Sequence, residues 1–480
     1  MQNKSAEKGV KPVGGLTGFT VNDIIKATGG RCLNHPAIKE VTGVSTDSRT
    51  VKSGAIFIAI PGERYDGHDF IARALAKGAS GVIIASKKIN YAKKRFGFDF
   101  KSADNRVFVA VDDTITALGD LARFHRERFD IPVAAITGSN GKTSAKEMIY
   151  IVLKTKWRPL KNSGTENNLI GVPHTLFKLQ DTYDSLVVEL GMNRRGEIKR
   201  LAEISRPNVG VITNIGPSHL QYLRNLSGVY AAKKELLDFL KSGDIAVLNG
   251  DDPILRSFGR ETLKTVRFGI ENNSDFRAES IKHEGRNWSF RVSGTTFLIK
   301  SASYHDIYNA LAAISIGALF GIRLARISEA LCGYVSLDKR MVRSIIEGIE
   351  FIDDTYNSNP LSMSSAIATL SSYNSKGSKV LVSGDMLELG RKSACYHGEM
   401  GRLVADSGID KFISVGKLAR NSFLAAKKSG MQNIWFCRTK KEAASVLKKI
   451  LKPDDVVLVK GSRTMRMEEV IKCFTISYIP

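Results

Sequence analysis

From residue 131 onward, short runs of consecutive apolar residues alternate with stretches whose apolar positions recur at helical spacing. Strands that are buried on both faces have such unbroken apolar runs, and helices between them are typical of parallel sheets. The pattern therefore predicts an α/β fold with a doubly wound, largely parallel central sheet. The predicted strands are 131–136, 185–190, 209–213 and 245–249, with helices at 143–157 and 228–241.

The same alternation returns near the carboxyl end of the chain. It predicts strands at 379–383, 411–415, 433–437 and 456–459, with helices between them. This part lacks a Gly-x-Gly-x-x-Gly turn, so it is predicted to be α/β without a dinucleotide fingerprint. The apolar stretch 310–322 is too short to span a bilayer and indicates a buried helix, so no integral membrane protein is expected.

The amino-terminal part has a different pattern of apolar and polar residues. Strands are predicted at 55–60, 81–85 and 107–111, separated by polar stretches rich in turn residues. The segment 86–106 is basic and has no clear period, which indicates a loop or small insertion. Residues 1–15 are polar and lack the apolar core of a secretory signal, so none is expected.

The length and the cysteines limit the organisation further. A chain of 480 residues is long enough for about three domains. We place them at 1–111, 112–338 and 339–480. The five cysteines stand singly without a CxxC pair, which indicates free thiols in a reducing compartment and hence a cytoplasmic protein.

The chain is strongly basic, with a formal net charge of +23. Its Lys and Arg residues form short clusters spread over the whole length rather than a basic tail or a stripe studded with aromatic residues. We interpret the surplus as a solvated basic surface that suits anionic substrates, and nonspecific contact with polyanions is the alternative. Nucleic acid is not expected as a partner.

A phosphate-binding loop is the strongest single motif. The sequence Thr-Gly-Ser-Asn-Gly-Lys-Thr at 137–143 lies between a predicted strand and a predicted helix. Glycines allow backbone N–H groups to surround phosphate oxygens, Lys142 adds a mobile positive charge, and Thr143 offers an oxygen to Mg²⁺. The longer GxxxxGK[ST] pattern fails because Ile136 occupies its first glycine position. The motif predicts ATP binding, but not what the ATP is used for.

Other polar residues follow the neighbouring strands. Glu189 ends one apolar strand and fits a second metal ligand, although an exposed edge residue is the alternative. His219 follows the next strand and could bind a metal or be structural. The loop 162–168 offers amide and carboxylate groups and is uninformative by itself.

Taken together, these motifs resemble the Mur ligases, which join an amino acid or dipeptide to a UDP-N-acetylmuramoyl acceptor. The matching segments of the central part are TGSNGKT, Glu166-Asn167-Asn168, Val187 to Gly191 and Asn214 to Leu220. The segments 47–49, 62–70, 353–360, 384–390 and 460–463 resemble the member that adds D-Ala-D-Ala. The Asp-Asn-Pro-Arg motif expected of the member that adds diaminopimelate or lysine is missing.

The resemblance implies a fold of three domains, a smaller UDP-binding domain, a central P-loop domain and a Rossmann-like C-terminal domain. It also implies roles for individual residues. ATP would be bound by Gly138, Ser139, Asn140, Gly141, Lys142, Thr143, Asn309, Arg340, Asp354 and Asn357. Mg²⁺ would be held by Thr143, Glu189, His219 and Lys233. The catalytic residues would be Lys142, Lys233 and His219. The other substrates would be bound by Asp47, Ser48, Arg49, Arg64, Asn167, Asn168, Lys460, Ser462 and Arg463.

Two of these positions need comment. Lys233 aligns with a lysine that is carbamoylated in many relatives, which suits a metal site because a carbamate behaves as a carboxylate; a solvated helix lysine is the alternative. Asp306 stands where relatives often have Asn, so the side-chain amide that would contact adenine there is missing.

The expected activity is ATP-dependent ligation of D-Ala-D-Ala to UDP-N-acetylmuramoyl-tripeptide through an acyl phosphate, by a monomer whose third domain closes over ATP. One alternative is a sister ligase that adds a single amino acid, or a ligase similar to folylpolyglutamate synthetase. Another is a basic P-loop protein whose ATP cycle drives nucleic-acid binding.

Overall fold

The computed structural model describes residues 18–97, 100, 105–284, 287–336 and 338–476. Its chain divides into two compact units. The first comprises residues up to 131 together with 169–184 and 203–206, and the second comprises the rest of 132–480. In the described ranges no helix is both long and apolar enough to cross a membrane. The expectation about residues 1–15 lies outside the described residues.

The first unit is built on a sheet with the strand order β2-β7-β6-β5-β4. Strands β4 to β7 run parallel and β2 is antiparallel to β7, while β1 and β3 pair separately. The three predicted strands are confirmed as β5, β6 and β7, whose buried residues form the core of the unit. The strands are β1 (Phe19–Thr20), β2 (Arg31–Cys32), β3 (Glu40–Val41), β4 (Val44–Ser45), β5 (Ile56–Ile58), β6 (Gly81–Ala85) and β7 (Val107–Val111). The helices are α1 (Val21–Thr28), η1 (Gly67–Phe70), α2 (Ile71–Ala76), η2 (Ser86–Lys88), α3 (Ile89–Phe96), α4 (Thr114–Arg126) and α6 (Gly171–Leu176).

The prediction of a loop for the basic segment 86–106 is wrong for its first half, because η2 and α3 are helical. Ala92 is buried, and Ile89 and Phe96 pack against the core of the unit. Gly97 ends the helix in the left-handed conformation, with basic residues in the last turn. The period was overlooked because basic residues at 87–88 and 93–95 surround these three apolar positions. Residues 98–99 and 101–104 of the segment lie outside the described residues.

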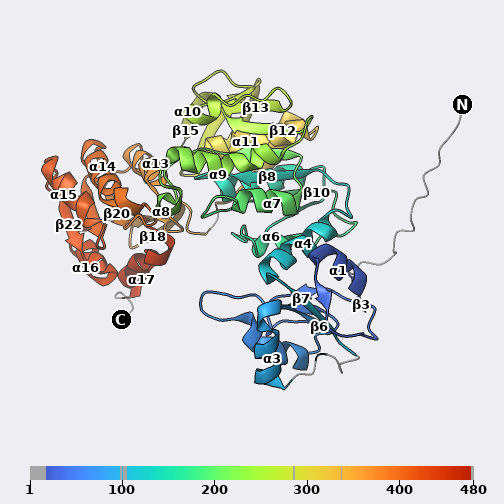
Figure 1. The fold of residues 1–480 in the computed structure, drawn as a ribbon. Coiled ribbons are helices and arrows are strands. Elements are labelled where there is room, and N and C mark those ends of the chain that lie inside the picture. The colour runs from blue at the N-terminus through green and yellow to red at the C-terminus, as the bar shows by residue number, and fades with distance from the viewer. Residues whose placement is uncertain (1–17, 98–99, 101–104, 285–286, 337, 477–480) are drawn as a thin grey trace, which may run out of the picture. The chain divides into compact units, whose positions relative to one another are not determined.

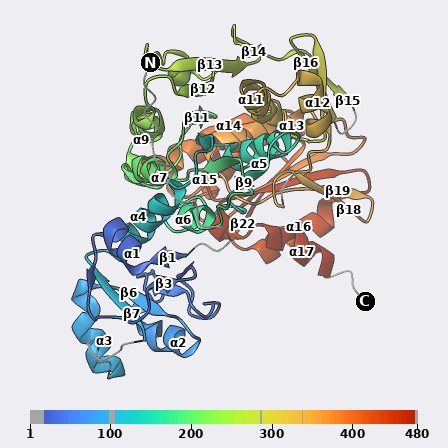
Figure 2. The same ribbon diagram turned by 90° about the vertical axis from the view of Figure 1, so that its right-hand side faces the viewer.

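The second unit contains the predicted parallel sheet, with the order β14-β13-β12-β11-β8-β10-β9 and parallel pairing throughout. Helices α5 and α11 pack against each other over its core (Figure 2). The predicted strands and helices, including the buried helix expected at 310–322, are confirmed to within a few residues. The strands are β8 (Val133–Thr137), β9 (Pro159–Lys161), β10 (Ser185–Glu189), β11 (Val209–Ile212), β12 (Ile245–Asn249), β13 (Lys264–Gly269) and β14 (Phe276–Arg277). The helices are α5 (Lys142–Leu153), α7 (Glu197–Ser205), α8 (Leu220–Leu223), α9 (Leu226–Phe239), α10 (Pro253–Arg256), α11 (Asp306–Leu319) and α12 (Leu324–Cys332).

Two antiparallel elements complete the unit, and the sequence pattern did not reveal them. Strands β15 (Glu279–Glu284), β16 (Asn287–Val292) and β17 (Thr295–Ile299) form a small antiparallel sheet whose apolar face joins the core beneath α11 and α12. Strand β18 (Val342–Ile346) forms a hairpin with β19 (Ile349–Asp354) and edges the C-terminal sheet.

The C-terminal sheet has the order β18-β19-β23-β20-β21-β22 and is parallel except for β18. Figure 1 shows its helices around the strands in orange and red. All four predicted strands are confirmed, as β20 (Lys379–Gly384), β21 (Lys411–Val415), β22 (Ile434–Cys437) and β23 (Val456–Lys460). The helices are α13 (Pro360–Ser371), η3 (Gly390–Lys392), α14 (Ser393–Asp406), α15 (Arg420–Lys428), α16 (Lys440–Ile450), η4 (Arg463–Met465) and α17 (Glu468–Ile476).

Candidate active site

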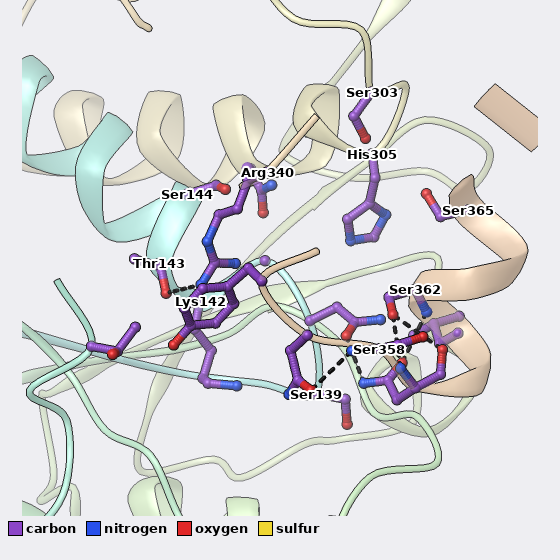
Figure 3. Close-up of a pocket in the computed structure, with 18 of the residues that line it drawn as sticks. Ser139, Lys142, Thr143, Ser144, Ser303, His305, Arg340, Ser358, Ser362 and Ser365 are labelled. Carbon is purple, nitrogen blue, oxygen red and sulfur yellow. Dashed lines mark hydrogen bonds between the residues drawn. The ribbon is translucent and has the colours of Figure 1, made fainter. Parts of the chain in front are cut away.

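A cavity of about 440 Å³ lies where the carboxyl ends of the strands in both parallel sheets of the second unit meet. Strands β8 and β10 of the central sheet end at its wall, and so do β19 and β23 of the C-terminal sheet. Ligands of open α/β sheets bind at such carboxyl edges. The volume suits a ligand of nucleotide size. Figure 3 shows polar side chains converging on it from α5, from the segment around His305 and from α13.

The predicted phosphate loop forms one wall of this cavity. Its glycines cannot be replaced without strain, because Gly138 has φ +155° and Gly141 has φ +79°. A Cβ at Gly138 would lie 1.9 Å from Thr213 Oγ1, and one at Gly141 would lie 2.3 Å from Asn309 Oδ1. The first N–H groups of α5 have no carbonyl within the helix to bind. The loop therefore offers donors and a helix amino terminus to an anion.

Two lysines converge on one carbonyl of the loop. Lys142 Nζ and Lys233 Nζ donate to Gly138 O at 2.8 and 2.9 Å. Burial lowers the pKa of Lys142, and burial together with the neighbouring Lys142 charge lowers the pKa of Lys233 well below its usual range. Lys233 is 2% exposed. A buried amine beside a second cation is held towards its neutral form, in which it can react as a nucleophile.

Glu189 lies at the end of β10 and is 1% exposed. Asn167 Nδ2 donates to its Oε1 at 2.7 Å. Among the described residues its Oε2 is buried without a hydrogen-bond partner. A buried carboxylate oxygen without a donor costs free energy unless a cation or a donor reaches it. Glu189 thus has the character expected of a metal ligand.

His219 lies in the wall of the cavity, in the left-handed conformation with φ 52° at the start of α8. Its Nδ1 is 2.7 Å from Glu388 Oε2, and the hydrogen bond from His219 lowers the pKa of Glu388. The backbone adds to this junction, because Gln221 N donates to Glu388 O at 2.9 Å. The Glu388 carboxylate is placed to orient the imidazole of His219.

The C-terminal sheet supplies the opposite wall. Arg340 donates from Nη2 to Thr143 Oγ1 at 3.0 Å and covers the ring of Tyr356 at 4.0 Å, and Figure 3 shows the first of these contacts. Lys460 pairs with Asp354 and donates to Asn357 O at 3.0 Å. Burial raises the pKa of Asp354, although the Lys460 charge opposes the shift.

The remaining wall comes from the amino end of α11. Asp306 accepts from Ser301 Oγ and from Asn309 Nδ2, at 2.5 and 2.8 Å, so each of its carboxylate oxygens is engaged within the chain. Asn309 Oδ1 is buried without a partner among the described residues and faces Gly141. Burial lowers the pKa of His305 to about 4, so this imidazole is neutral near pH 7.

Most of the residues expected at the site line this cavity, and a few lie close behind it. The lining residues are Ser139, Asn140, Gly141, Lys142, Thr143, Asn167, Glu189, His219, Lys233, Asn309, Arg340, Asp354, Asn357 and Lys460. Gly138 belongs to the same loop. Ser462 accepts from Leu387 N at 2.8 Å, and Arg463 N donates to Asn357 Oδ1 at 3.4 Å, so both support the wall. Asn168 follows Asn167 and is exposed.

The four residues expected to bind the UDP-sugar belong to the first unit. Arg49 pairs with Asp47 through two contacts, Nε to Oδ1 at 2.9 Å and Nη2 to Oδ2 at 2.7 Å. Hydrogen bonds from Arg49 lower the pKa of Asp47 to about 2. Ser48 is buried, and Arg64 is exposed on the turn between Pro61 and Asp66.

Sequence reasoning missed several residues of this site. Ser144, His305 and Asn359 line the cavity, and the side-chain amides of Asn359 and Asn140 are 2.8 Å apart. Lys146 lies behind Glu189. Its spacing of four residues from Lys142, on the same face of α5, was the signal that could have revealed it.

Three stretches of the chain match family profiles. They are described as Mur ligase family, catalytic domain, over residues 40–126; Mur ligase middle domain, over 136–317; and Mur ligase, glutamate ligase domain, over 339–463. The chain is also 34% identical over 459 residues to UDP-N-acetylmuramoyl-tripeptide--D-alanyl-D-alanine ligase of Bacillus subtilis (strain 168), covering 94% of this chain and 97% of that protein. The enzyme of the same name from Escherichia coli (strain K12) is 34% identical, with 89% and 92% covered.

Solved structures agree with these sequence relationships. MurF from Acinetobacter baumannii superposes with a TM-score of 0.86 at 30% identity, covering 96% of this chain and 99% of that chain. MurF ligase from Thermotoga maritima, solved in complex with ADP, has a TM-score of 0.79 at 27% identity, with 90% and 97% covered. The chain therefore belongs to the Mur ligase family, and within that family it is of the MurF type.

Proposed function

We propose that this protein joins D-alanyl-D-alanine to UDP-N-acetylmuramoyl-tripeptide and hydrolyses ATP to ADP and phosphate in doing so. The observation that carries the proposal is the convergence in one cavity of a glycine-rich loop, Lys142 and a buried, unpartnered carboxylate oxygen of Glu189. The curated relatives named above carry this activity in their names, and the chain covers nearly their whole length.

The residues that form the walls of the cavity are suited to bind ATP. Gly138 and Gly141 let the loop pack against Thr213 and Asn309 more closely than a Cβ would allow, and the amino terminus of α5 offers its N–H groups at the loop. Lys142 would leave Gly138 O to contact the β- and γ-phosphates. Arg340 contacts Thr143, and Asn309 lies beside Gly141. From these positions both would reach the nucleotide.

The same walls fit Mg²⁺. This ion keeps several waters and takes one or two carboxylates together with phosphate oxygens. Glu189 Oε2 and Thr143 Oγ1 would hold it, with His219 and a carbamoylated Lys233 near a second ion. No cluster of three His, Cys, Asp or Glu side chains occurs among the described residues, and a Mg²⁺ site that relies on phosphate and water does not need one. When bound, the ion neutralises phosphate charge and draws electron density from the transferred phosphorus.

In the first step the terminal carboxylate of the tripeptide attacks the γ-phosphorus of ATP. A bond forms between the carboxylate oxygen and phosphorus, the bond to the β,γ-bridging oxygen breaks, and ADP leaves. Because two anions must meet, positive charge has to be placed beforehand. Lys142 and the amino terminus of α5 would provide it, together with Arg340, which reaches Thr143 from the opposite wall.

In the second step the amine of D-Ala-D-Ala attacks the acyl carbon. The tetrahedral intermediate collapses with loss of inorganic phosphate, a much better leaving group than hydroxide, and the nitrogen loses a proton as the peptide bond forms. The oxyanion of the intermediate is the second charge to be stabilised. Loop 162–168 borders the cavity at Glu189, where this step would take place, and His219 also lines the cavity.

A panel of amino substrates distinguishes this activity from that of a sister ligase. The protein would be incubated with ATP, Mg²⁺ and UDP-N-acetylmuramoyl-tripeptide, and the mass of the product would be measured for D-Ala-D-Ala, D-Ala, L-Lys and diaminopimelate in turn. A product with D-Ala-D-Ala alone is expected. Efficient addition of a single amino acid in place of D-Ala-D-Ala would contradict the proposal while leaving the ligase chemistry intact.

A further inference from the structure

Lys146 is a buried lysine of the second unit to which no role has been given so far. It lies on α5 one turn after Lys142, and its side chain is 0% exposed. Its Nζ donates to Asn162 O at 2.9 Å and to Gly164 O at 2.7 Å, and it lies 3.2 Å from Glu147 Oε1. An ammonium group has three N–H donors, so these acceptors satisfy the group completely.

The two carbonyls that Lys146 binds belong to the loop that organises Glu189. Asn162 accepts from Glu189 N at 3.0 Å and donates to Glu189 O at 3.2 Å. Asn167 donates to Glu189 Oε1 at 2.7 Å, and its carbonyl accepts from Gly191 N at 2.8 Å. The loop therefore forms hydrogen bonds with both the backbone and the side chain of Glu189. Lys146 in turn connects this loop to α5 through hydrogen bonds.

Charge links the same two residues directly. Lys146 Nζ is 4.0 Å from Glu189 Oε2, which is too long for a hydrogen bond but close enough for attraction in a buried site. Burial lowers the pKa of Lys146, while Glu189 and Glu147 raise it. Because the three donors of Lys146 are used elsewhere, Oε2 keeps no hydrogen-bond partner among the described residues.

We propose that Lys146 is a positioning residue for the metal-binding and phosphate-binding end of the cavity, which ties loop 162–168 to α5 and thereby fixes the Glu189 carboxylate. The inference rests on the proposed function, since it assigns Glu189 to the bound Mg²⁺. Lys146 itself is fully buried and does not belong to the residues that line the cavity. Ligand-orienting partners behind a metal site commonly change metal affinity or activity by about 10–100-fold when removed.

The chain offers a matched control in Lys161. This residue pairs with the same Glu147 from β9 and is partly exposed, and its described contacts do not include the loop carbonyls. Replacing either lysine with methionine removes one positive charge from the same cluster. A difference between Lys146→Met and Lys161→Met therefore reports the tie to loop 162–168 rather than the charge of the cluster.

The experiment compares the full-length wild type, Lys146→Met and Lys161→Met. Hydrogen exchange followed by mass spectrometry is read over peptides that cover 159–170, and ADP binding is measured by calorimetry over a Mg²⁺ titration. For Lys146→Met we expect faster exchange in 162–168 with α5 still protected. We also expect a Mg²⁺ requirement raised about tenfold or more, and unchanged ADP affinity in the absence of Mg²⁺. Lys161→Met should behave like the wild type in every measurement.

Unchanged exchange in 162–168, or an unchanged Mg²⁺ requirement in a folded Lys146→Met protein, would overturn the proposal. So would an equal loss of ADP affinity with and without Mg²⁺, since that would indicate a general packing defect. If Lys146→Met does not fold, Lys146→Gln, which keeps two N–H donors without the charge, is measured in the same way. None of these readouts requires ligation, so a failure of the proposed function would be seen separately, as a wild type that binds Mg²⁺ and ADP but forms no peptide.

Discussion

Replacing Lys142 with alanine is expected to lower the rate of ligation by about 10²–10³-fold or more, the loss typical of removing one fixed group that stabilises transition-state charge. Lys142 is the first side chain of α5, and its Nζ rests on Gly138 O in the loop that would cradle the phosphates. The substitution leaves the glycines and the helix amino terminus in place. Binding of ADP should therefore fall much less than the turnover rate.

Phosphate release in the complete reaction and calorimetric titration with ADP measure the two effects separately. Lys154→Ala is the matched control, because Lys154 is an exposed lysine at the end of the same helix. Retention of more than about a tenth of the turnover in Lys142→Ala would be incompatible with a role in the first step, in which two anions meet.

The second large effect is expected at Lys233. Replacement with alanine should lower turnover by at least about 10²-fold, because the site would lose a carboxylate-like ligand and Gly138 O would lose a donor. The depressed pKa of this lysine favours the neutral amine that reacts with carbon dioxide. In that reaction a bond forms between Nζ and the carbon atom, and the nitrogen releases a proton. Formate, a small carboxylate, should restore part of the activity of Lys233→Ala.

The carbamate can also be observed directly. After equilibration with ¹³C-bicarbonate, ¹³C NMR should show a carbamate signal in the wild type that is missing from Lys233→Ala. Lys234→Ala, which alters the next residue on α9, should keep both the signal and the activity, since Lys234 pairs with Asp238 on the exposed side of the helix. A fully active wild type without the signal would mean that Lys233 acts as an unmodified amine.

The sequence was sufficient to predict the parallel sheets, because their buried strands are unbroken apolar runs. Val187 and Val188 in β10, or Val457 and Val459 in β23, have 1% exposure or less and cannot be mistaken for an exposed alternating strand. The antiparallel strands β15 to β17 were missed because polar residues such as Ser289 and Arg291 interrupt their apolar positions, which pack together only across the strands, as Phe290 does on Phe297. Helix α3 was missed for the related reason that the basic run Lys93-Lys94-Arg95 stands between two of its three apolar positions.

The site could be predicted from the sequence where the functional residues stand at the end of a strand or directly after it. The loop after β8 and Glu189 at the end of β10 could be placed because parallel strands bring their carboxyl ends together. Partners brought from elsewhere in the chain could not be placed. Glu388 is far from His219 in the sequence, although their side chains are in contact. Lys146 binds backbone carbonyl oxygens, which every residue has, so no residue type in the sequence indicates its partners. The domain limits and the individual roles of these residues stay predictions.

One cavity is proposed to couple ATP cleavage to the addition of D-Ala-D-Ala. The most direct measurement counts inorganic phosphate and ligated product in the same reaction, with each of ATP, UDP-N-acetylmuramoyl-tripeptide and D-Ala-D-Ala left out in turn. We expect one phosphate to be released for each peptide bond formed, and no sustained release when any component is missing. Phosphate released at the full rate without D-Ala-D-Ala, or with no product formed, would contradict it.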